Sequence, residues 1–246
     1  MVDTIKRFVS YDLSLSFSIV NWLQHRIMER YYVRGPINSL IIGSGGGNEV
    51  YKLCYLNNSV TTIEHDPVAK VGIDKMMEGL SNARYEVVVG DAVECVQSQK
   101  VQFVLMSQVL EHIDDDYGLL KKLAEICSPH ARLIISTPTS LHGLLGSQSI
   151  VDPIAKGPNH VRVGYEGKEL DLLCKSLGLH KLARFYLGNP VLNVIWLVDT
   201  YFIQKKWVSL PYKVFRLLFR YLLIPLSWWV RSPYIQISIY TKMPTH

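Results

Sequence analysis

The sequence predicts an α/β protein built on a mainly parallel β-sheet. Between about residues 40 and 187, short apolar runs alternate with stretches of helical periodicity. The first apolar run is followed at once by a glycine run at residues 43–47. Repeated strand–helix units of this kind favour parallel strands joined by right-handed crossovers. The chain has 246 residues, of which 48% are hydrophobic and 19% charged, so it can form a packed core. Collagen-like, coiled-coil and fully disordered classes are thereby excluded.

Five buried strands are expected in the first part of the chain, each an apolar run bounded by turn residues. They cover residues 39–42, 60–64, 85–89, 101–106 and 132–136. Two closing strands are expected at residues 180–186 and 234–240. The ligand of such a sheet binds where the strands end in their carboxyl direction, at the point where strand order reverses. The glycine run follows the first strand and lies at that edge.

Helices are expected between these strands, and several have clear start or stop signals. Asn48 is a candidate N-cap, and Asp66 followed by Pro67 predicts an N-cap and a first helical residue. Three consecutive aspartates at 114–116 favour a helix N-terminus electrostatically. Gly178 is expected just beyond the end of a helix over residues 169–177. The residues expected to face inward are Val50, Leu53, Cys54 and Leu56, then Val68, Val71 and Met76, then Leu119, Leu120, Leu123 and Ile126, then Leu170, Leu173 and Leu177.

Composition divides the chain into four parts. Residues 1–35 are expected to form a helical segment, 36–188 the core and 234–246 its closing strand. Residues 189–233 form a separate basic and aromatic segment, with six basic residues, one acidic residue and four of the five tryptophans. The whole net charge of +5 therefore comes from this segment. The rest is neutral, and we expect no nucleic-acid partner.

Cysteine usage indicates a reducing compartment. Cys54, Cys95, Cys127 and Cys174 are far apart and form no CxxC pair, so neither a disulfide framework nor a metal site is expected. Charged residues within the first dozen positions argue against a secretory signal. A cytoplasmic location follows as the expectation, with or without peripheral contact with a membrane.

The glycine loop gains meaning from the acids that follow it. Glycine permits a tight strand-to-helix turn and close approach of the backbone to a ligand. Glu64 ends the second strand about 20 residues later, where an acid can accept hydrogen bonds from both ribose hydroxyls. Asp91 ends the third strand and can accept from the exocyclic amine of a base. Each feature alone is weak, but three consecutive strand ends with this chemistry predict a nucleoside site.

The order of these motifs resembles the class I S-adenosylmethionine-dependent methyltransferases. The matching stretches run over about 140 residues. They are LIIGSGGGNEV at 40–50, TTIEHDP at 61–67, VVVGDAVE at 87–94, FVLMSQVLEHI at 103–113, RLIISTPT at 132–139 and HVRVGYEGKELDLLCKSLGL at 160–179. The resemblance implies a three-layer α/β/α Rossmann-like methyltransferase fold. It also implies a seven-stranded, mostly parallel sheet with an antiparallel last strand and a helical insertion before it.

The resemblance also implies a binding site for S-adenosyl-L-methionine. Gly43, Gly45 and Gly47 would lie against the methionyl part and the ribose. Glu64 would hold the ribose hydroxyls with His65 beside the adenine, while Asp91 and Ala92 would meet the adenine edge. Ser107 and Gln108 would lie near the methionine end and the transferable methyl group.

Three alternatives are weighed against this reading. NAD enzymes share the glycine loop and the ribose acid but not the Val-Leu-Glu-His stretch at 109–112. Aminopropyltransferases resemble the first two strands but normally carry an aspartate after the fourth, where Met106-Ser107-Gln108 has none. A binding or regulatory protein without turnover is the third alternative. It is kept because Ile41 replaces a frequent acid and Gly46 loosens the loop.

Two histidines are candidates for a catalytic base. A base is needed only where the acceptor must lose a proton, and histidine suits that role near neutral pH. His112 follows the fourth strand, with an ordering role in the turn as its alternative. His160 lies in the loop after the fifth strand, where the family builds its acceptor site. Arg162, two residues on, is expected to pair with an anionic acceptor, with Asp152 or with Glu166.

The basic segment has three interpretations. Lys213, Arg216 and Arg220 share one face of a predicted helix whose other positions are apolar, and Trp228 and Trp229 follow. A helix lying in a membrane interface, a lid over an apolar acceptor pocket and a homodimer interface all fit this pattern.

The expected function is methyl transfer to a small, sugar-linked or lipid-linked acceptor, at oxygen.

Overall fold

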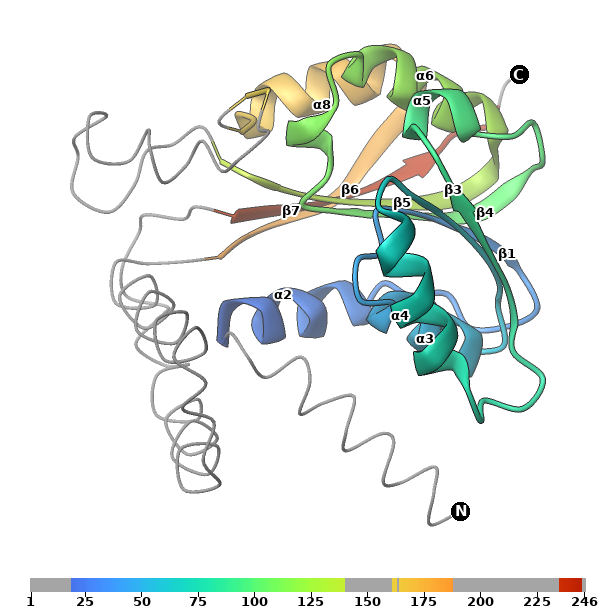
Figure 1. Ribbon diagram of the computed structural model, residues 1–246. Coiled ribbons are helices and arrows are strands. Elements are labelled where there is room, and N and C mark those ends of the chain that lie inside the picture. The colour runs from blue at the N-terminus through green and yellow to red at the C-terminus, as the bar shows by residue number, and fades with distance from the viewer. Residues whose placement is uncertain (1–18, 140–160, 163, 188–234, 245–246) are drawn as a thin grey trace, which may run out of the picture.

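A seven-stranded sheet forms the centre of the computed structural model, which describes residues 19–139, 161–162, 164–187 and 235–244 (Figure 1). The strand order is β3-β2-β1-β4-β5-β7-β6. Strand β7 pairs antiparallel with β5 and β6, and the other neighbours pair in parallel. The strands are β1 Asn38–Ile42, β2 Ser59–Glu64, β3 Arg84–Val89, β4 Val101–Ser107, β5 Cys127–Pro138, β6 Leu179–Leu187 and β7 Ile235–Lys242. The predicted sheet with an antiparallel last strand is confirmed.

Helices cover both faces of this sheet, which gives the three predicted layers. One face carries α2 Ile19–Glu29, α3 Asn48–Tyr55 and α4 Pro67–Met77 (Figure 1). The other face carries α5 Ala92–Cys95, α6 Asp116–Ile126 and α8 Gly167–Ser176 (Figure 1). A single 3-10 turn, η2 Leu110–His112, follows β4. Residues 188–234, which include the basic segment, lie outside the described residues.

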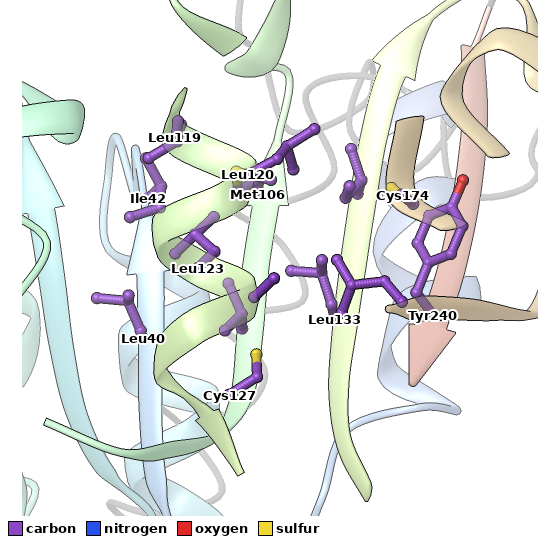
Figure 2. Packing of buried hydrophobic residues seen from close by; sticks show 14 of the residues in the cluster. Leu40, Ile42, Met106, Leu119, Leu120, Leu123, Cys127, Leu133, Cys174 and Tyr240 are labelled. Carbon is purple, nitrogen blue, oxygen red and sulfur yellow. The ribbon is translucent and has the colours of Figure 1, made fainter. Parts of the chain in front are cut away.

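Alternation along the buried strands builds two separate cores. Leu40 and Ile42 of β1 point toward α6, whereas Ile41 between them packs in the opposite core with α3. Figure 2 shows Leu119, Leu120 and Leu123 of α6 against β1 and β4. All three leucines are fully buried. Each such side chain contributes about 1.5–3 kcal/mol relative to an exposed one.

Most predicted elements are confirmed, and two details are corrected. Val68 and Val71 of α4, expected to face inward, are 72% and 69% exposed. The buried pair is Ile73 and Met77, because the apolar residues of α4 occupy more than one face and only this one meets α3 and the glycine loop. Helix α3 has Gly47 as its N-cap, with Asn48 already helical, because the left-handed turn of the loop ends at this glycine.

The topology places a crossover point between β1 and β4. The chain runs outward from β1 to β2 and β3, then returns to lay β4 on the other side of β1. The connections that leave β1 and β4 at their carboxyl ends therefore diverge to opposite faces of the sheet. An open α/β sheet binds its ligands in the crevice formed there.

Candidate active site

The glycine loop between β1 and α3 owes its shape to three left-handed residues. Gly43, Gly45 and Gly47 have φ angles of 68°, 50° and 83°. At Gly43 a Cβ atom would also collide with Val109 Cγ2, and at Gly47 it would lie 2.9 Å from Ile73 Cγ1. The two ends of the loop are thus packed between neighbouring elements. Its middle faces open space, because a Cβ atom on Gly45 would have no heavy atom within 4 Å.

Glu64 lies against this loop at the end of β2. Its side chain is largely buried, and Oε1 accepts a hydrogen bond from the backbone N–H of Gly45 at 3.3 Å. Burial raises the pKa of Glu64 above its ordinary value, although backbone N–H groups of Gly45 and Ser44 oppose the shift. The next residue, His65, is exposed. The acid predicted to hold the ribose therefore lies beside the glycine loop.

Asp91 and Ala92 follow β3, whose end lies beside the end of β2. The register pairs Glu64 with Val89, and Gly90 N donates to Glu64 O at 2.9 Å. Asp91 Oδ1 accepts from the backbone N–H groups of the short helix α5, those of Val93 at 2.7 Å and Glu94 at 3.1 Å. Asp91 is an N-cap as well as a candidate adenine contact, and Ala92 behind it is buried.

Ser107 ends β4 and Gln108 follows it, so both lie on the other side of the crossover point from β2 and β3. They belong to a group of polar side chains that the sequence did not predict. Ser107 pairs in register with Ser136 of β5. The side chain of Gln24, on α2, donates from Nε2 to Ser107 Oγ at 2.8 Å and to Ser136 Oγ at 2.9 Å. Gln108, in a left-handed conformation with φ 56°, is a second donor to Ser136 Oγ, at 3.2 Å.

Helix α2 is attached to α3 by charged side chains as well. His25 Nδ1 lies 3.0 Å from Glu49 Oε1, and Lys52 Nζ lies 3.4 Å from Glu29 Oε1. Burial alone would lower the pKa of His25, but the carboxylates of Glu49 and Glu29 outweigh it and the pKa is raised. Burial likewise opposes the charged form of Glu49, but the His25 imidazolium outweighs it and the pKa of Glu49 is lowered. A charged pair therefore ties α2 to the helix that the glycine loop begins.

Glu111 is a buried acid that the sequence analysis passed over in favour of its neighbour His112. Its side chain is 1% exposed, and Oε2 has no hydrogen-bond partner among the described residues. Burial raises the pKa of Glu111 to about 7. Its backbone oxygen accepts from Val161 N at 3.0 Å and from Arg162 N at 3.3 Å. The acid is thus held where β4 meets the loop that follows β5.

The structure describes one of the two predicted catalytic histidines. His112 is exposed at the end of η2, and His160 lies outside the described residues. Arg162 pairs with Asp116, its Nη1 2.9 Å from Oδ2, while Asp152, one of the acids named from the sequence, lies outside the described residues. It also lies 4.9 Å from the ring centroid of Tyr165, whose hydroxyl donates to the same Asp116 oxygen at 2.6 Å. These contacts order the loop that returns to β4.

Neither a metal site nor a membrane-spanning helix is found among the residues that the structure describes. There, no group of three or more His, Cys, Asp or Glu side chains has the arrangement of a metal site. Among the same residues, no helix combines the length and apolar character that crossing a bilayer requires. All four cysteines are free, and burial raises the pKa of the Cys54 and Cys174 thiols to about 12, as expected for core residues.

Comparison with known proteins agrees with this geometry. Residues 40–135 match the family described as a methyltransferase domain. No curated protein matches the sequence significantly. Among solved structures, a proposed sarcosine dimethylglycine methyltransferase from Galdieria sulphuraria superposes with a TM-score of 0.65 at 17% identity, over 90% of this chain and 84% of that one. A methyltransferase from Archaeoglobus fulgidus superposes with a TM-score of 0.57 at 16% identity, over 89% and 93%.

A third structure shows the same fold as part of a longer protein. Phosphoethanolamine N-methyltransferase 2 from Haemonchus contortus, in complex with S-adenosyl-L-methionine, superposes with a TM-score of 0.63 at 14% identity. The match covers 91% of this chain and 53% of that one. At such identities the likeness concerns the fold alone.

The fold is that of an α/β domain of the methyltransferase type, with the glycine loop and Glu64 in contact at the carboxyl edge of its sheet. Residues 40–135 match the methyltransferase-domain family, and the methyltransferase fold that the sequence resemblance implies is confirmed. The residues at the carboxyl edge fit the cofactor of that family. The middle of the glycine loop opens to free space at Gly45 and Gly46, and a buried carboxylate lies beside it.

Proposed function

We propose that the chain transfers a methyl group from S-adenosyl-L-methionine to oxygen of a small, sugar-linked or lipid-linked acceptor. The observation that carries the cofactor half of this proposal is the contact between Glu64 and the left-handed Gly45. Glu64 holds the ribose hydroxyls, and Asp91 with Ala92 lies along the adenine, with His65 at the rim. Gly43, Gly45 and Gly47 leave room for the methionyl part, next to Ser107 and Gln108.

The sulfonium of the bound cofactor supplies an activated methyl group, so the protein mainly aligns the acceptor and excludes water. The acceptor oxygen forms a bond to the methyl carbon while the carbon–sulfur bond breaks and its electron pair stays on sulfur. A hydroxyl acceptor must also lose its proton. Alignment of the two reactants supplies up to about 7–11 kcal/mol of such a barrier.

Glu111 is a candidate base for that proton, besides the two histidines. A base works best when its pKa lies near the working pH, and the pKa of Glu111 is about 7. Its Oε2 has no hydrogen-bond partner among the described residues, and it lies in η2, where residues 161 and 162 hydrogen-bond its backbone oxygen. Both observations support this role. His112 and His160 remain candidates, the first exposed at the same turn and the second in the loop beyond β5.

Calorimetric titration and a transfer screen test the proposal. Wild-type protein should bind S-adenosylmethionine and S-adenosylhomocysteine, and Glu64→Gln should weaken both by about tenfold, as expected for loss of charge-assisted hydrogen bonds. Glu86→Gln is the matched control, because Glu86 lies on β3 of the same sheet but away from the carboxyl ends of the strands. Absence of binding by the wild type would refute the cofactor site. Preference for the decarboxylated cofactor would favour aminopropyl transfer instead.

Residues 189–233 are proposed to bring the enzyme to a membrane surface. Their basic and aromatic composition, with Trp228 and Trp229 between Arg220 and Arg231 in the sequence, supports this. Flotation with liposomes tests it. The protein should float with vesicles that contain anionic lipid and float less with neutral vesicles. Protein that stays at the bottom with both kinds would overturn membrane contact, and a dimer in sedimentation would then favour self-association through this segment.

A further inference from the structure

Gln24 occupies an unusual place for a residue of the N-terminal segment. Its side chain is 3% exposed and reaches the carboxyl ends of two neighbouring strands, 83 and 112 residues further along the chain. Ser107 and Ser136 are partners in the β4–β5 register, so their hydroxyls lie side by side on the face that α2 covers. One amide nitrogen bridges the pair.

The hydrogen-bond count fixes what these hydroxyls can still do. Gln24 Nε2 has two hydrogens, and each is donated to one serine oxygen. Ser136 Oγ accepts a second hydrogen bond, from Gln108 Nε2, so both of its lone pairs are occupied. Ser107 Oγ keeps one lone pair and its proton. Gln24 thereby sets the rotation of the Ser107 hydroxyl and, through Ser136, the position of the Gln108 side chain.

We infer that Gln24 is a positioning residue that orients Ser107 and Gln108 toward the sulfonium end of the bound cofactor. This inference rests on the proposed cofactor site, in which these two residues lie near the methyl group. A sulfonium is a cation and is favoured by oriented oxygen lone pairs, whereas the thioether of S-adenosylhomocysteine is neutral. In a buried site, polar groups fixed in advance act more strongly than mobile ones. Correct orientation should therefore favour S-adenosylmethionine over its demethylated product.

The test compares the affinities of three probes in calorimetric titration of the full chain. The probes are S-adenosylmethionine, S-adenosylhomocysteine and 5′-methylthioadenosine, which lacks the amino-acid part. Gln24→Met keeps the length and apolar stem of the side chain but removes both donors. We expect it to weaken binding of S-adenosylmethionine about fivefold to tenfold, as expected for neutral hydrogen bonds, and binding of the other two less than about twofold.

Gln102→Met is the matched control. Gln102 is also a glutamine, but it lies on β4, where its Oε1 accepts from Asn38 N at 2.8 Å near the amino end of the strand, the opposite edge of the sheet. This variant should leave all three affinities unchanged. Gln24→Glu adds a second readout, because a carboxylate accepts but cannot donate and the serine hydroxyls must then turn toward it. We expect Gln24→Glu to change the ratio of the two cofactor affinities without unfolding the protein.

The outcomes separate the inference from the proposal beneath it. A wild type that binds none of the probes overturns the proposed cofactor site itself. A wild type that binds all three, with Gln24 variants that weaken every probe equally or none, overturns the role of Gln24 and leaves the site intact. Circular dichroism melting of each variant shows whether an equal loss comes from unfolding of α2.

Discussion

The two halves of the candidate site, on either side of the β1–β4 crossover, are built by different means. The cofactor half consists of backbone turns and strand ends that are close in sequence, as in the contact of Gly45 with Glu64 across 19 residues. The half around Ser107 and Gln108 consists of side chains from distant segments, as in the contacts of Gln24 with Ser107 and Ser136. The first half depends on the left-handed conformation of glycines, so few substitutions in its backbone turns are tolerated. The second half depends on hydrogen-bonded side chains, so single substitutions can change its affinity for a ligand.

The sharpest test of this contrast lies within the glycine loop. Gly43→Ala should reduce cofactor binding by about 100-fold or more, because the residue has a left-handed φ and its new Cβ would collide with Val109 Cγ2. Gly46→Ala is the control, since no heavy atom lies within 4 Å of a Cβ there and φ is not left-handed. Titration with S-adenosylhomocysteine measures both. Equal loss in the two variants would mean that ligand contact, and not backbone shape, limits the loop.

The fold was predictable because its elements are defined locally. Helix α6 begins after Asp115, which caps it by accepting from Gly118 N, and its four predicted inward residues are all buried. Gly178 has the expected left-handed φ of 75° after α8. Helix α4 shows the limit of such reasoning. Its apolar residues fit more than one face, and the neighbouring glycine loop, not the periodicity, selects Ile73 over Val68 and Val71.

The half around the glycine loop was predictable for the same reason, whereas the contacts of Gln24 and the burial of Glu111 were not. Gly43, Glu64 and Asp91 each follow a predicted strand directly, so parallel pairing alone places them at one edge. Gln24 carries no such signal, since a single glutamine in a predicted helix is an ordinary surface residue. Glu111 stands beside the more conspicuous His112, and only its burial distinguishes it. Long-range packing created both environments.

The attachment of α2 to α3 gives the next largest expected effect, and it concerns stability. His25→Ala leaves the buried Glu49 carboxylate without its cation, which should cost about 3 kcal/mol of unfolding free energy. Glu49→Gln should also destabilise, and the double variant should lose less than the sum of the two single losses. Urea denaturation measures all three. Additive losses would show that the two side chains do not interact.

The pH dependence of the same pair follows from the two shifts. The raised pKa of His25 means that its contribution is full below its ordinary value of 6.5 and is lost as pH rises through the raised pKa. The lowered pKa of Glu49 means that its contribution is full above 4.5 and is lost as pH falls through the lowered pKa. The difference in unfolding free energy between the wild type and the double variant should therefore be largest between pH 4.5 and pH 6.5. A flat difference would contradict the charged pair.

Glu111 should behave in the opposite way, because it lacks the counter-charge that Glu49 has. Its pKa is raised from 4.5 to about 7, so the native state is favoured by the proton and loses stability as pH rises through this interval. Glu111→Gln mimics the protonated form. It should match the wild type at about pH 4 and be more stable than the wild type by roughly 3 kcal/mol at about pH 8.

The same substitution separates stability from catalysis at Glu111. If the acid accepts a proton from the acceptor hydroxyl, Glu111→Gln should lower the rate of methyl transfer by about 100-fold while stability at alkaline pH rises. His112→Ala is the parallel variant at the neighbouring residue. A Glu111→Gln variant that is less stable than the wild type at about pH 8 would show that the carboxylate is solvated or paired in solution.

The smallest expected effects distinguish two aspartates with the same local role. Asp66 caps α4 by accepting from Val68 N at 2.8 Å, and Asp91 caps α5 through Val93 and Glu94. Replacement of either by alanine should cost about 1 kcal/mol of unfolding free energy. Only Asp91→Ala should also weaken binding of S-adenosylhomocysteine, by several-fold, since Asp91 alone is proposed to meet the adenine.

Asp91→Asn keeps the capping oxygen, so its stability should stay near that of the wild type while the affinity still changes. If Asp91→Asn binds as tightly as the wild type, Asp91 is a helix cap and the adenine edge is read by other groups.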